Sequence, residues 1–93
     1  KFGIYAVLVD VLDGPHKGQY HGAASLGVRP MFQGEEANIE TFIFDFTGDL
    51  YGANLSVGLI DYLRPEATFD SLEAFIAQMD ADCLRARDIL AAL

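Results

Sequence analysis

The chain has 93 residues, of which 52% are hydrophobic, and its 6 basic and 14 acidic residues give a net charge of −8. This length suits one small domain, and the hydrophobic content predicts a packed core and excludes a disordered chain. The negative charge would repel a nucleic-acid backbone, so we expect no nucleic-acid partner.

The cysteine content and the hydropathy pattern indicate where the protein works. Cys83 is the only cysteine, so no disulfide forms within the chain, which favours a reducing, cytoplasmic location; we interpret it as a small buried hydrophobic residue. No apolar window is long enough to cross a bilayer, so we expect no membrane partner. The first residues already have the composition of a strand, so we expect the chain to begin inside a folded unit.

The N-terminal third predicts two strands rich in β-branched, aromatic and aliphatic residues. The first is Phe2–Val9, and the turn residues Asp13-Gly14-Pro15 follow it. The second, Lys17–Leu26, is weaker because its small residues add little packing. We expect Gly27–Pro30 to break this strand and Gln33–Glu36 to form an exposed loop.

Two further strands are predicted in the middle of the chain. In the third, Asn38–Phe46, alternation places Glu40 and the aromatic residues Phe42 and Phe44 on one face. The fourth is Asn54–Leu63. The connections are too short for parallel crossovers, so we expect an antiparallel sheet.

The last quarter of the chain has the three- and four-residue spacing of one amphipathic helix. Asp70 is the expected N-cap, with Glu73 three residues later in a reciprocal capping arrangement. The predicted apolar face comprises Leu72, Phe75, Ile76, Met79, Cys83, Ala86, Leu90 and Leu93. Short strands followed by one helix favour a small barrel or curled sheet that the helix covers.

Three segments together resemble the riboflavin kinase family. They are Asp49-Leu50-Tyr51-Gly52, Leu63-Arg64-Pro65-Glu66 and Phe69-Asp70-Ser71-Leu72-Glu73. The resemblance implies an all-β fold, a small antiparallel Greek-key β-barrel with a C-terminal α-helix. Residues 1–93 would then form a riboflavin kinase-like domain without its N-terminal part, and in bacterial FAD synthetases an FMN adenylyltransferase domain precedes it.

Glu40 is the sharpest candidate for chemistry. Burial beside Phe42 and Phe44 would remove water from the carboxylate and make its ionised form less stable, which suits it to accept a proton near neutral pH. The alternative is an acid near a strand end that reaches solvent. Asn38-Ile39-Glu40-Thr41 resembles the strand whose glutamate deprotonates the terminal ribityl hydroxyl in riboflavin kinases. We therefore expect Glu40 to be buried and to point into a cleft near Arg64.

A second group of candidates follows the fourth strand. Arg64 precedes a proline, and its guanidinium could donate paired hydrogen bonds to an anion, or it could pair on the surface with Glu66 or Asp61. The resemblance implies that Arg64, Phe69, Asp70 and Ser71 border riboflavin and its new phosphate. Asp70 and Ser71 can be explained equally by the start of the helix.

The resemblance also implies a nucleotide side to the site, with Tyr51 near the adenine of ATP. Phe42 stands where many members have histidine, which we interpret as a tolerated change in the contacts with the nucleotide. The family holds Mg²⁺ with a Pro-Thr-Ala-Asn motif upstream of the first strand, and these residues contain no such motif. His16 and His21 lack metal-ligand spacing, so we expect no metal ligands within the chain.

The resemblance implies a riboflavin kinase, which transfers the ATP γ-phosphoryl to the riboflavin 5′-hydroxyl to give FMN and ADP. Without the metal-binding motif, we expect the isolated chain to be nearly inactive. Two alternatives stay open. One is a non-catalytic flavin- or nucleotide-binding barrel that serves as an interaction module, and the other is a protein-interaction domain that uses the acidic face of the helix. The oligomeric state, including a homo-oligomer, is open too.

Overall fold

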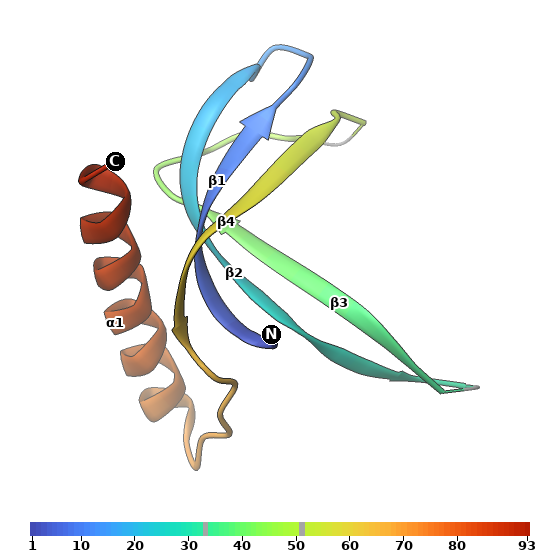
Figure 1. Ribbon diagram of the computed structural model, residues 1–93, viewed down its shortest axis with the longest axis vertical. Helices are drawn as coiled ribbons and strands as arrows, with labels where there is room; N and C mark the ends of the chain where they lie inside the picture. Colours follow the sequence, from blue (N-terminus) through green and yellow to red (C-terminus); the bar gives the residue numbers. More distant parts are fainter. Residues whose placement is uncertain (33, 51) are drawn as a thin grey trace.

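A computed structural model describes residues 1–32, 34–50 and 52–93, with the backbone alone at 29–31. It contains four strands followed by one helix (Figure 1). The elements are β1 (Gly3–Val11), β2 (Gly18–Met31), β3 (Gly34–Ile43), β4 (Leu55–Arg64) and α1 (Leu72–Ala91). In the described part of the chain, no helix is long and apolar enough to cross a membrane.

The four strands form one antiparallel sheet in the order β3-β2-β1-β4. Three consecutive strands are neighbours and the fourth returns beside the first, which is the Greek-key arrangement. The prediction of an antiparallel Greek-key fold with a C-terminal helix is therefore confirmed. The described sheet is not closed into a barrel, because β3 and β4 are its two outer strands.

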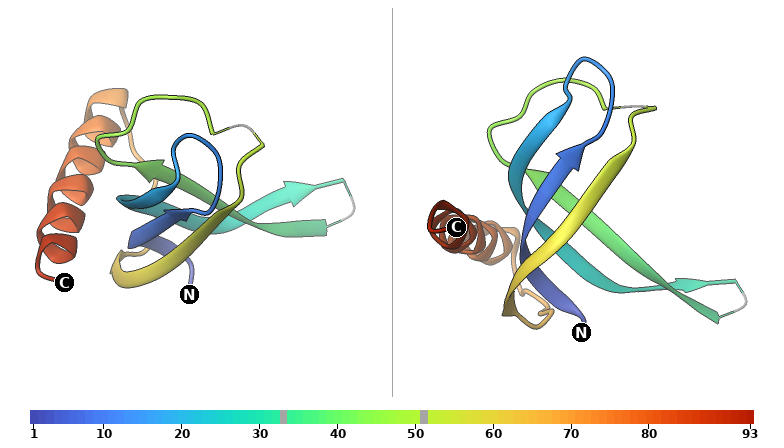
Figure 2. Two further views of the ribbon diagram at one scale, coloured as in Figure 1. Left: turned by 90° about the horizontal axis from the view of Figure 1, so that it is seen from above. Right: turned by 45° about the horizontal axis from the view of Figure 1, so that its top comes forward.

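The longest hairpin differs from the sequence prediction. Residues 27–30 belong to β2 and residues 34–36 to β3, so the predicted break at 27–30 is wrong and the loop predicted at 33–36 is largely strand. Beyond Leu26, β2 pairs with β3 alone, and a strand with an open edge tolerates Pro30. Figure 2 shows this hairpin extending well away from α1.

Helix α1 packs against one face of the sheet and contacts β1, β2 and β4. The core on this face comprises Ala6, Phe44, Leu63, Ala86 and Leu90. The opposite face has its own cluster of Val7, Val9 and Ala24, with Tyr5, Tyr20, Ile43 and Val57 packed against it. The buried residues of α1 all lie in its C-terminal half, so this half anchors the helix.

The N-terminal half of α1 is less buried than its apolar spacing predicts. Phe75 is 42% exposed and Met79 is 39% exposed. Ser71, not Asp70, is the N-cap, because its hydroxyl accepts a hydrogen bond from the Ala74 amide at 3.1 Å. The predicted cap is therefore one residue too early, although the helix begins where the pattern places it.

Candidate functional site

A cleft of about 330 Å³ lies between the sheet and the N-terminal half of α1. Its walls are mostly apolar, with a small number of charged groups. The lining residues are Ile4, Ala23, Ala24, Ser25, Glu40, Thr41, Phe42, Arg64, Phe75, Met79, Asp82 and Cys83. A concave apolar site with a few polar groups is typical of a small-molecule binding site.

Glu40 and Arg64 lie at the two ends of one row of residues across the sheet. Glu40 of β3 pairs with Ser25 of β2, Ser25 pairs with Ile4 of β1, and Ile4 pairs with Arg64 of β4. All four residues line the cleft. Three strand spacings separate the backbones of the outer two by roughly 14 Å. The carboxylate and the guanidinium therefore reach the cleft from the two outer strands of the sheet, β3 and β4.

A bulge at the end of β4 directs Arg64 toward the helix. Tyr5 pairs with Tyr62 and Ile4 with Arg64, so Leu63 is an extra residue between two pairs. A bulge changes the direction of neighbouring side chains. Consequently Leu63 can enter the core beside α1 while Arg64, the next residue, still points to the same side.

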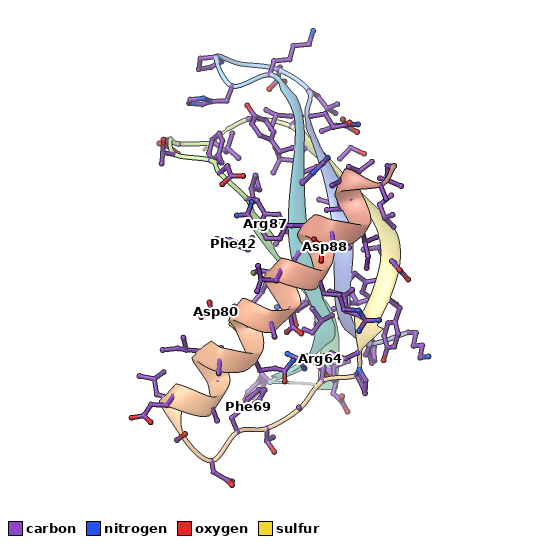
Figure 3. All side chains as sticks on the ribbon, turned by 90° about the vertical axis from the view of Figure 1, so that its left-hand side faces the viewer. Phe42, Arg64, Phe69, Asp80, Arg87 and Asp88 are labelled. Atoms are coloured by element: carbon purple, nitrogen blue, oxygen red, sulfur yellow. The ribbon has the colours of Figure 1, made fainter. Side chains whose placement is uncertain are left out.

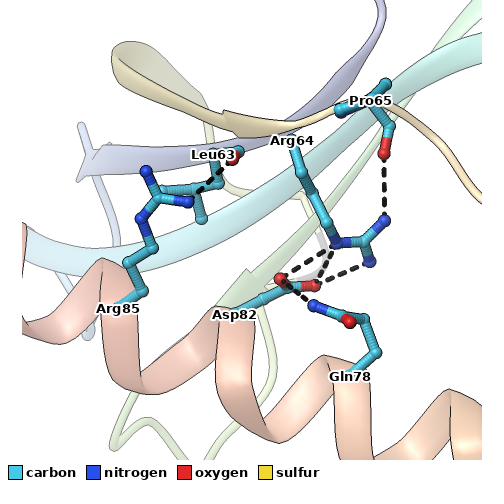
Figure 4. Close-up of polar contacts among 6 residues, drawn as sticks. All are labelled: Leu63, Arg64, Pro65, Gln78, Asp82 and Arg85. Atoms are coloured by element: carbon cyan, nitrogen blue, oxygen red, sulfur yellow. Dashed lines mark hydrogen bonds and ion pairs between the residues drawn. The ribbon is translucent and has the colours of Figure 1, made fainter.

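Arg64 is held by α1 (Figure 4). Its Nη2 donates to Asp82 Oδ2 at 2.7 Å, and its Nε lies 3.0 Å from both carboxylate oxygens. Its Nη1 donates to the Pro65 carbonyl at 3.0 Å, and Gln78 donates to Asp82 Oδ1 at 3.0 Å. The alternative pairing of Arg64 with Glu66 or Asp61 is wrong, because its partner is the buried Asp82.

The segment 65–71 between β4 and α1 places Phe69 near Arg64 (Figure 3). The Phe69 ring centroid lies 5.9 Å from the Arg64 guanidinium carbon and 5.6 Å from the Phe75 ring centroid. Asp70 and Ser71 are exposed and do not line the cleft. The structure thus brings Phe69 close to the cleft and leaves the other two at the start of the helix.

Glu40 lines the cleft but is exposed, so the prediction of a buried carboxylate is wrong. The reason is its position on an outer strand, where water reaches the side chain from the open edge. Asn38 donates a hydrogen bond to Glu40 Oε1 at 3.3 Å, which links two residues of the same strand face. The carboxylate is therefore accessible to a ligand in the cleft.

Phe42 of β3 and Cys83 of α1 form part of the apolar wall of the cleft. Phe42 is 56% exposed and packs edge-on against Phe44, with their ring centroids 5.8 Å apart. Burial raises the pKa of the Cys83 thiol above its ordinary value of 9.0, and the thiol is half-buried. Cys83 thus contributes a neutral, weakly polar surface. Tyr51, the predicted adenine contact, lies outside the described residues.

A smaller hollow of about 170 Å³ lies where the β1–β2 and β3–β4 connections meet. Asp13 accepts hydrogen bonds from the Asn54 backbone amide at 3.1 Å and from its side chain at 2.8 Å. These bonds hold the pKa of Asp13 below its usual 3.8. The contact joins two connections that are distant in the sequence and so shapes this end of the sheet.

The described residues do not fit a metal site. Within ranges 1–32, 34–50 and 52–93, no group of three or more His, Cys, Asp or Glu side chains could hold a metal ion. A magnesium ion takes oxygen ligands, chiefly carboxylates and waters. The expected magnesium ion therefore has no ligand set among these residues.

The sequence did not identify the residues of α1 that line the cleft as candidates for the site. Phe75 and Met79 were expected to be part of the predicted apolar face, and both contribute to the wall of the cleft. Asp82 was not a candidate, although it lies three residues after Met79 and four before Ala86, on the apolar face. A charge at a core position was the signal that could have identified it.

Comparisons with known proteins identify the family. The family model for Flavokinase, described as riboflavin kinase, matches residues 1–90. A bifunctional riboflavin kinase/FMN adenylyltransferase from Pseudomonas fluorescens is 41% identical over 96% of this chain and 28% of its own length. Human riboflavin kinase is 39% identical over 68% of this chain and 41% of its own length.

A solved structure has the same fold. It is titled as a macrolide-efflux protein from Streptococcus pneumoniae and has a TM-score of 0.76 and 37% identity, covering 87% of this chain and 25% of that one. The chain thus spans well under half the length of these relatives. Because the family model covers nearly the whole chain, the chain belongs to the riboflavin kinase family.

Proposed function

We propose that this chain is the main part of a riboflavin kinase module, which converts riboflavin and ATP to FMN and ADP in a longer protein. The observation that carries the proposal is the cleft, in which an accessible carboxylate, Glu40, lies at one end of an apolar slot between sheet and helix. Family membership and the names of the relatives support it.

The apolar walls suit the flat ring system of riboflavin. Phe42 on the sheet side and Phe75 and Met79 on the helix side offer aromatic and thioether surfaces that pack well against an aromatic ligand. Phe69 extends this surface from the segment 65–71. Asp70 and Ser71 would reach the ligand only if this segment closes over it.

Glu40 is the general base in this proposal. Its carboxylate takes the proton of the riboflavin 5′-hydroxyl, and the hydroxyl oxygen forms a bond to the γ-phosphorus of ATP. The bond between that phosphorus and the β–γ bridging oxygen breaks, and ADP leaves. Most of the rate enhancement in such a transfer comes from positioning and charge stabilisation, to which a general base adds.

The nucleotide would approach from the Glu40 end, near Phe42. Tyr51 is proposed to contact adenine from the β3–β4 connection. Magnesium would stabilise charge on the phosphates in this chemistry, but the described residues offer no ligand set for it. We therefore expect the 93 residues alone to phosphorylate riboflavin negligibly, and efficient FMN formation by the isolated chain would refute this expectation.

The parent protein is proposed to be a bifunctional FAD synthetase, with residues 1–93 in its riboflavin kinase module and an FMN adenylyltransferase domain before it. The similarity to the Pseudomonas fluorescens bifunctional enzyme over only 28% of that protein supports this assignment. Measuring FAD as well as FMN production by the parent protein tests it.

A Glu40→Gln variant of the parent protein tests the kinase proposal. Loss of the general base should lower kcat by about 10²–10⁴-fold and leave riboflavin affinity nearly unchanged. Glu36→Gln is the matched control, because Glu36 lies on the same strand, is exposed and does not line the cleft. Equal kcat for Glu40→Gln and wild type would refute the role of Glu40.

The second candidate is a flavin-binding module without kinase activity. Phe42, which stands where the resemblance to the family implies a histidine, is the observation that favours it. This candidate predicts that the wild-type parent quenches riboflavin fluorescence on binding but forms no FMN with ATP. Turnover by the wild-type parent would exclude it.

A further inference from the structure

We propose that Asp82 is a positioning residue that orients Arg64 toward the ring end of the flavin, at the opposite end of the cleft from the reacting hydroxyl. The proposal rests on the proposed function and extends it to a residue on α1. Two independent observations carry it, the separation of Glu40 from Arg64 and the burial of Asp82.

The row of paired residues that runs across the sheet from Glu40 to Arg64 determines which end of the ligand Arg64 contacts. Glu40 and Arg64 lie on the two outer strands, separated by three strand spacings, roughly 14 Å measured along the sheet. If Glu40 accepts a proton from the 5′-hydroxyl at the end of the ribityl chain, the isoalloxazine ring extends along the cleft toward Arg64. The new phosphate then forms at the Glu40 end, and Arg64 faces the polar edge of the ring.

The ring carries carbonyl and nitrogen acceptors at one edge, and a guanidinium is a planar set of donors that suits such an edge. Arg64 side-chain exposure is 20%, and the residue lines the cleft together with Asp82. Its planar group has to lie in one orientation for directional hydrogen bonds to the ligand. The side chain alone has many rotamers, so an external constraint is required.

Asp82 supplies this constraint. It is only 7% exposed and is the one buried charged side chain among the described residues. Its carboxylate contacts Nε and Nη2 of Arg64, which fixes the plane of the guanidinium and leaves Nη1 directed to the Pro65 carbonyl (Figure 4). Gln78 donates to Asp82 and fixes the carboxylate in turn. The network therefore sets the orientation of Arg64 before a ligand arrives.

A buried acid on a helix could also act only in stability, so the test has to separate the two roles. Riboflavin Kd and kcat are measured in the parent protein for Asp82→Asn, for Arg64→Met and for the double variant. Each single variant should weaken riboflavin binding by about tenfold, the weight of one well-placed charged hydrogen bond. Because chemistry occurs at the other end, kcat at saturation should change by less than about twofold.

The double variant gives the decisive result. If Asp82 acts through Arg64, Asp82→Asn has no further effect on riboflavin Kd once Arg64 is methionine. Additive losses of affinity, or an Asp82→Asn variant that binds riboflavin as wild type does, would overturn the proposal. Lumiflavin, which lacks the ribityl chain, should show the same loss of affinity as riboflavin, because the lost contact is to the ring.

Two controls keep the test interpretable. Asp88→Asn makes the same charge change on α1 about 9 Å further along the helix, and Figure 3 shows it away from Arg64, so riboflavin Kd should not change. If Asp82→Asn does not fold, Arg64→Lys keeps the charge but removes the planar fork, and wild-type affinity in that variant would overturn the proposal. A wild-type parent without riboflavin binding would instead refute the proposed function itself.

Discussion

Arg87 and Asp45 connect the C-terminal half of α1 to the connection after β3, with Nη1 donating to Oδ2 at 2.8 Å. The guanidinium carbon of Arg87 also lies 4.4 Å from the ring centroid of Phe44, the core residue before Asp45. One arginine therefore binds a carboxylate and covers an aromatic ring at the point where the chain leaves the sheet.

The Asp45 contact predicts an acid-sensitive part of the stability. Its hydrogen bond to Arg87 lowers the Asp45 pKa below the ordinary 3.8. The stabilisation is therefore fully present above pH 3.8 and is lost as the pH falls through the lower native pKa. Asp45→Asn should be less stable than wild type at pH 7, and the difference should shrink as the pH falls below 3.8. Asparagine tolerates the left-handed φ of 56°, so backbone strain is not introduced.

Chemical denaturation of both proteins between pH 2 and pH 7 measures this difference. Asp10→Asn is a suitable control, since its carboxylate accepts a 3.2 Å bond from the uncharged Gln19 on the neighbouring strand and forms no ion pair within the described part of the chain. A gap between Asp45→Asn and wild type that is independent of pH would contradict the prediction.

Leu90 should be a major contributor to stability. It is 2% exposed and packs in the core between α1 and the sheet with Ala86 and Leu63. Leu90→Ala should lower the free energy of unfolding by about 2–5 kcal/mol, because it leaves a cavity in that core. Urea denaturation measures the change. Leu93→Ala serves as control, since Leu93 is 71% exposed and should change stability little.

The helix cap can be tested with two neighbouring residues. Ser71 caps α1 through its hydroxyl, so Ser71→Ala should destabilise the protein by about 1 kcal/mol. Asp70→Ala should have a smaller effect, because Asp70 lies before the cap. Thermal denaturation without ligand compares the two variants, and the reverse order of stability would contradict the assignment.

Cys83 offers a direct probe of cleft occupancy. Its thiol lines the cleft, and burial raises its pKa above 9.0, so it is mostly protonated at pH 7. Alkylation by iodoacetamide should be slow at pH 7 and faster at higher pH, because the thiolate is the reactive form. Saturating riboflavin should slow alkylation at every pH by covering the thiol. Alkylation that is unaffected by riboflavin would place the flavin elsewhere.

Much of the fold could be predicted from local pattern. Composition, turn residues and alternation located all four strands, and the spacing of apolar residues located α1 to within one residue of its cap. The extent of the β2–β3 hairpin could not be predicted, because residues 27–31 and 34–38 are stabilised by pairing with each other and not by their own propensity. The position of β3 at an open edge likewise depends on which strands are neighbours in the sheet. A local sequence pattern does not contain this information.

Residues of the site could be predicted where the sequence around a single residue was informative. Glu40 and Arg64 were identified from the sequence, and the structure places both at one cleft. Their order along the cleft depends on the strand register, and the exposure of Glu40 depends on its place in an outer strand. The partnership of Arg64 with Asp82 joins residues 18 positions apart through the packing of the helix. Such pairings arise only from tertiary structure.

The contact of Arg64 with Asp82 also joins the end of β4 directly to the middle of α1, and the segment 65–71 lies in the chain between these two elements. Motions of that segment can consequently occur without detachment of the helix, whose anchoring core lies further along, at Ala86 and Leu90. Local opening of this kind requires far less free energy than global unfolding.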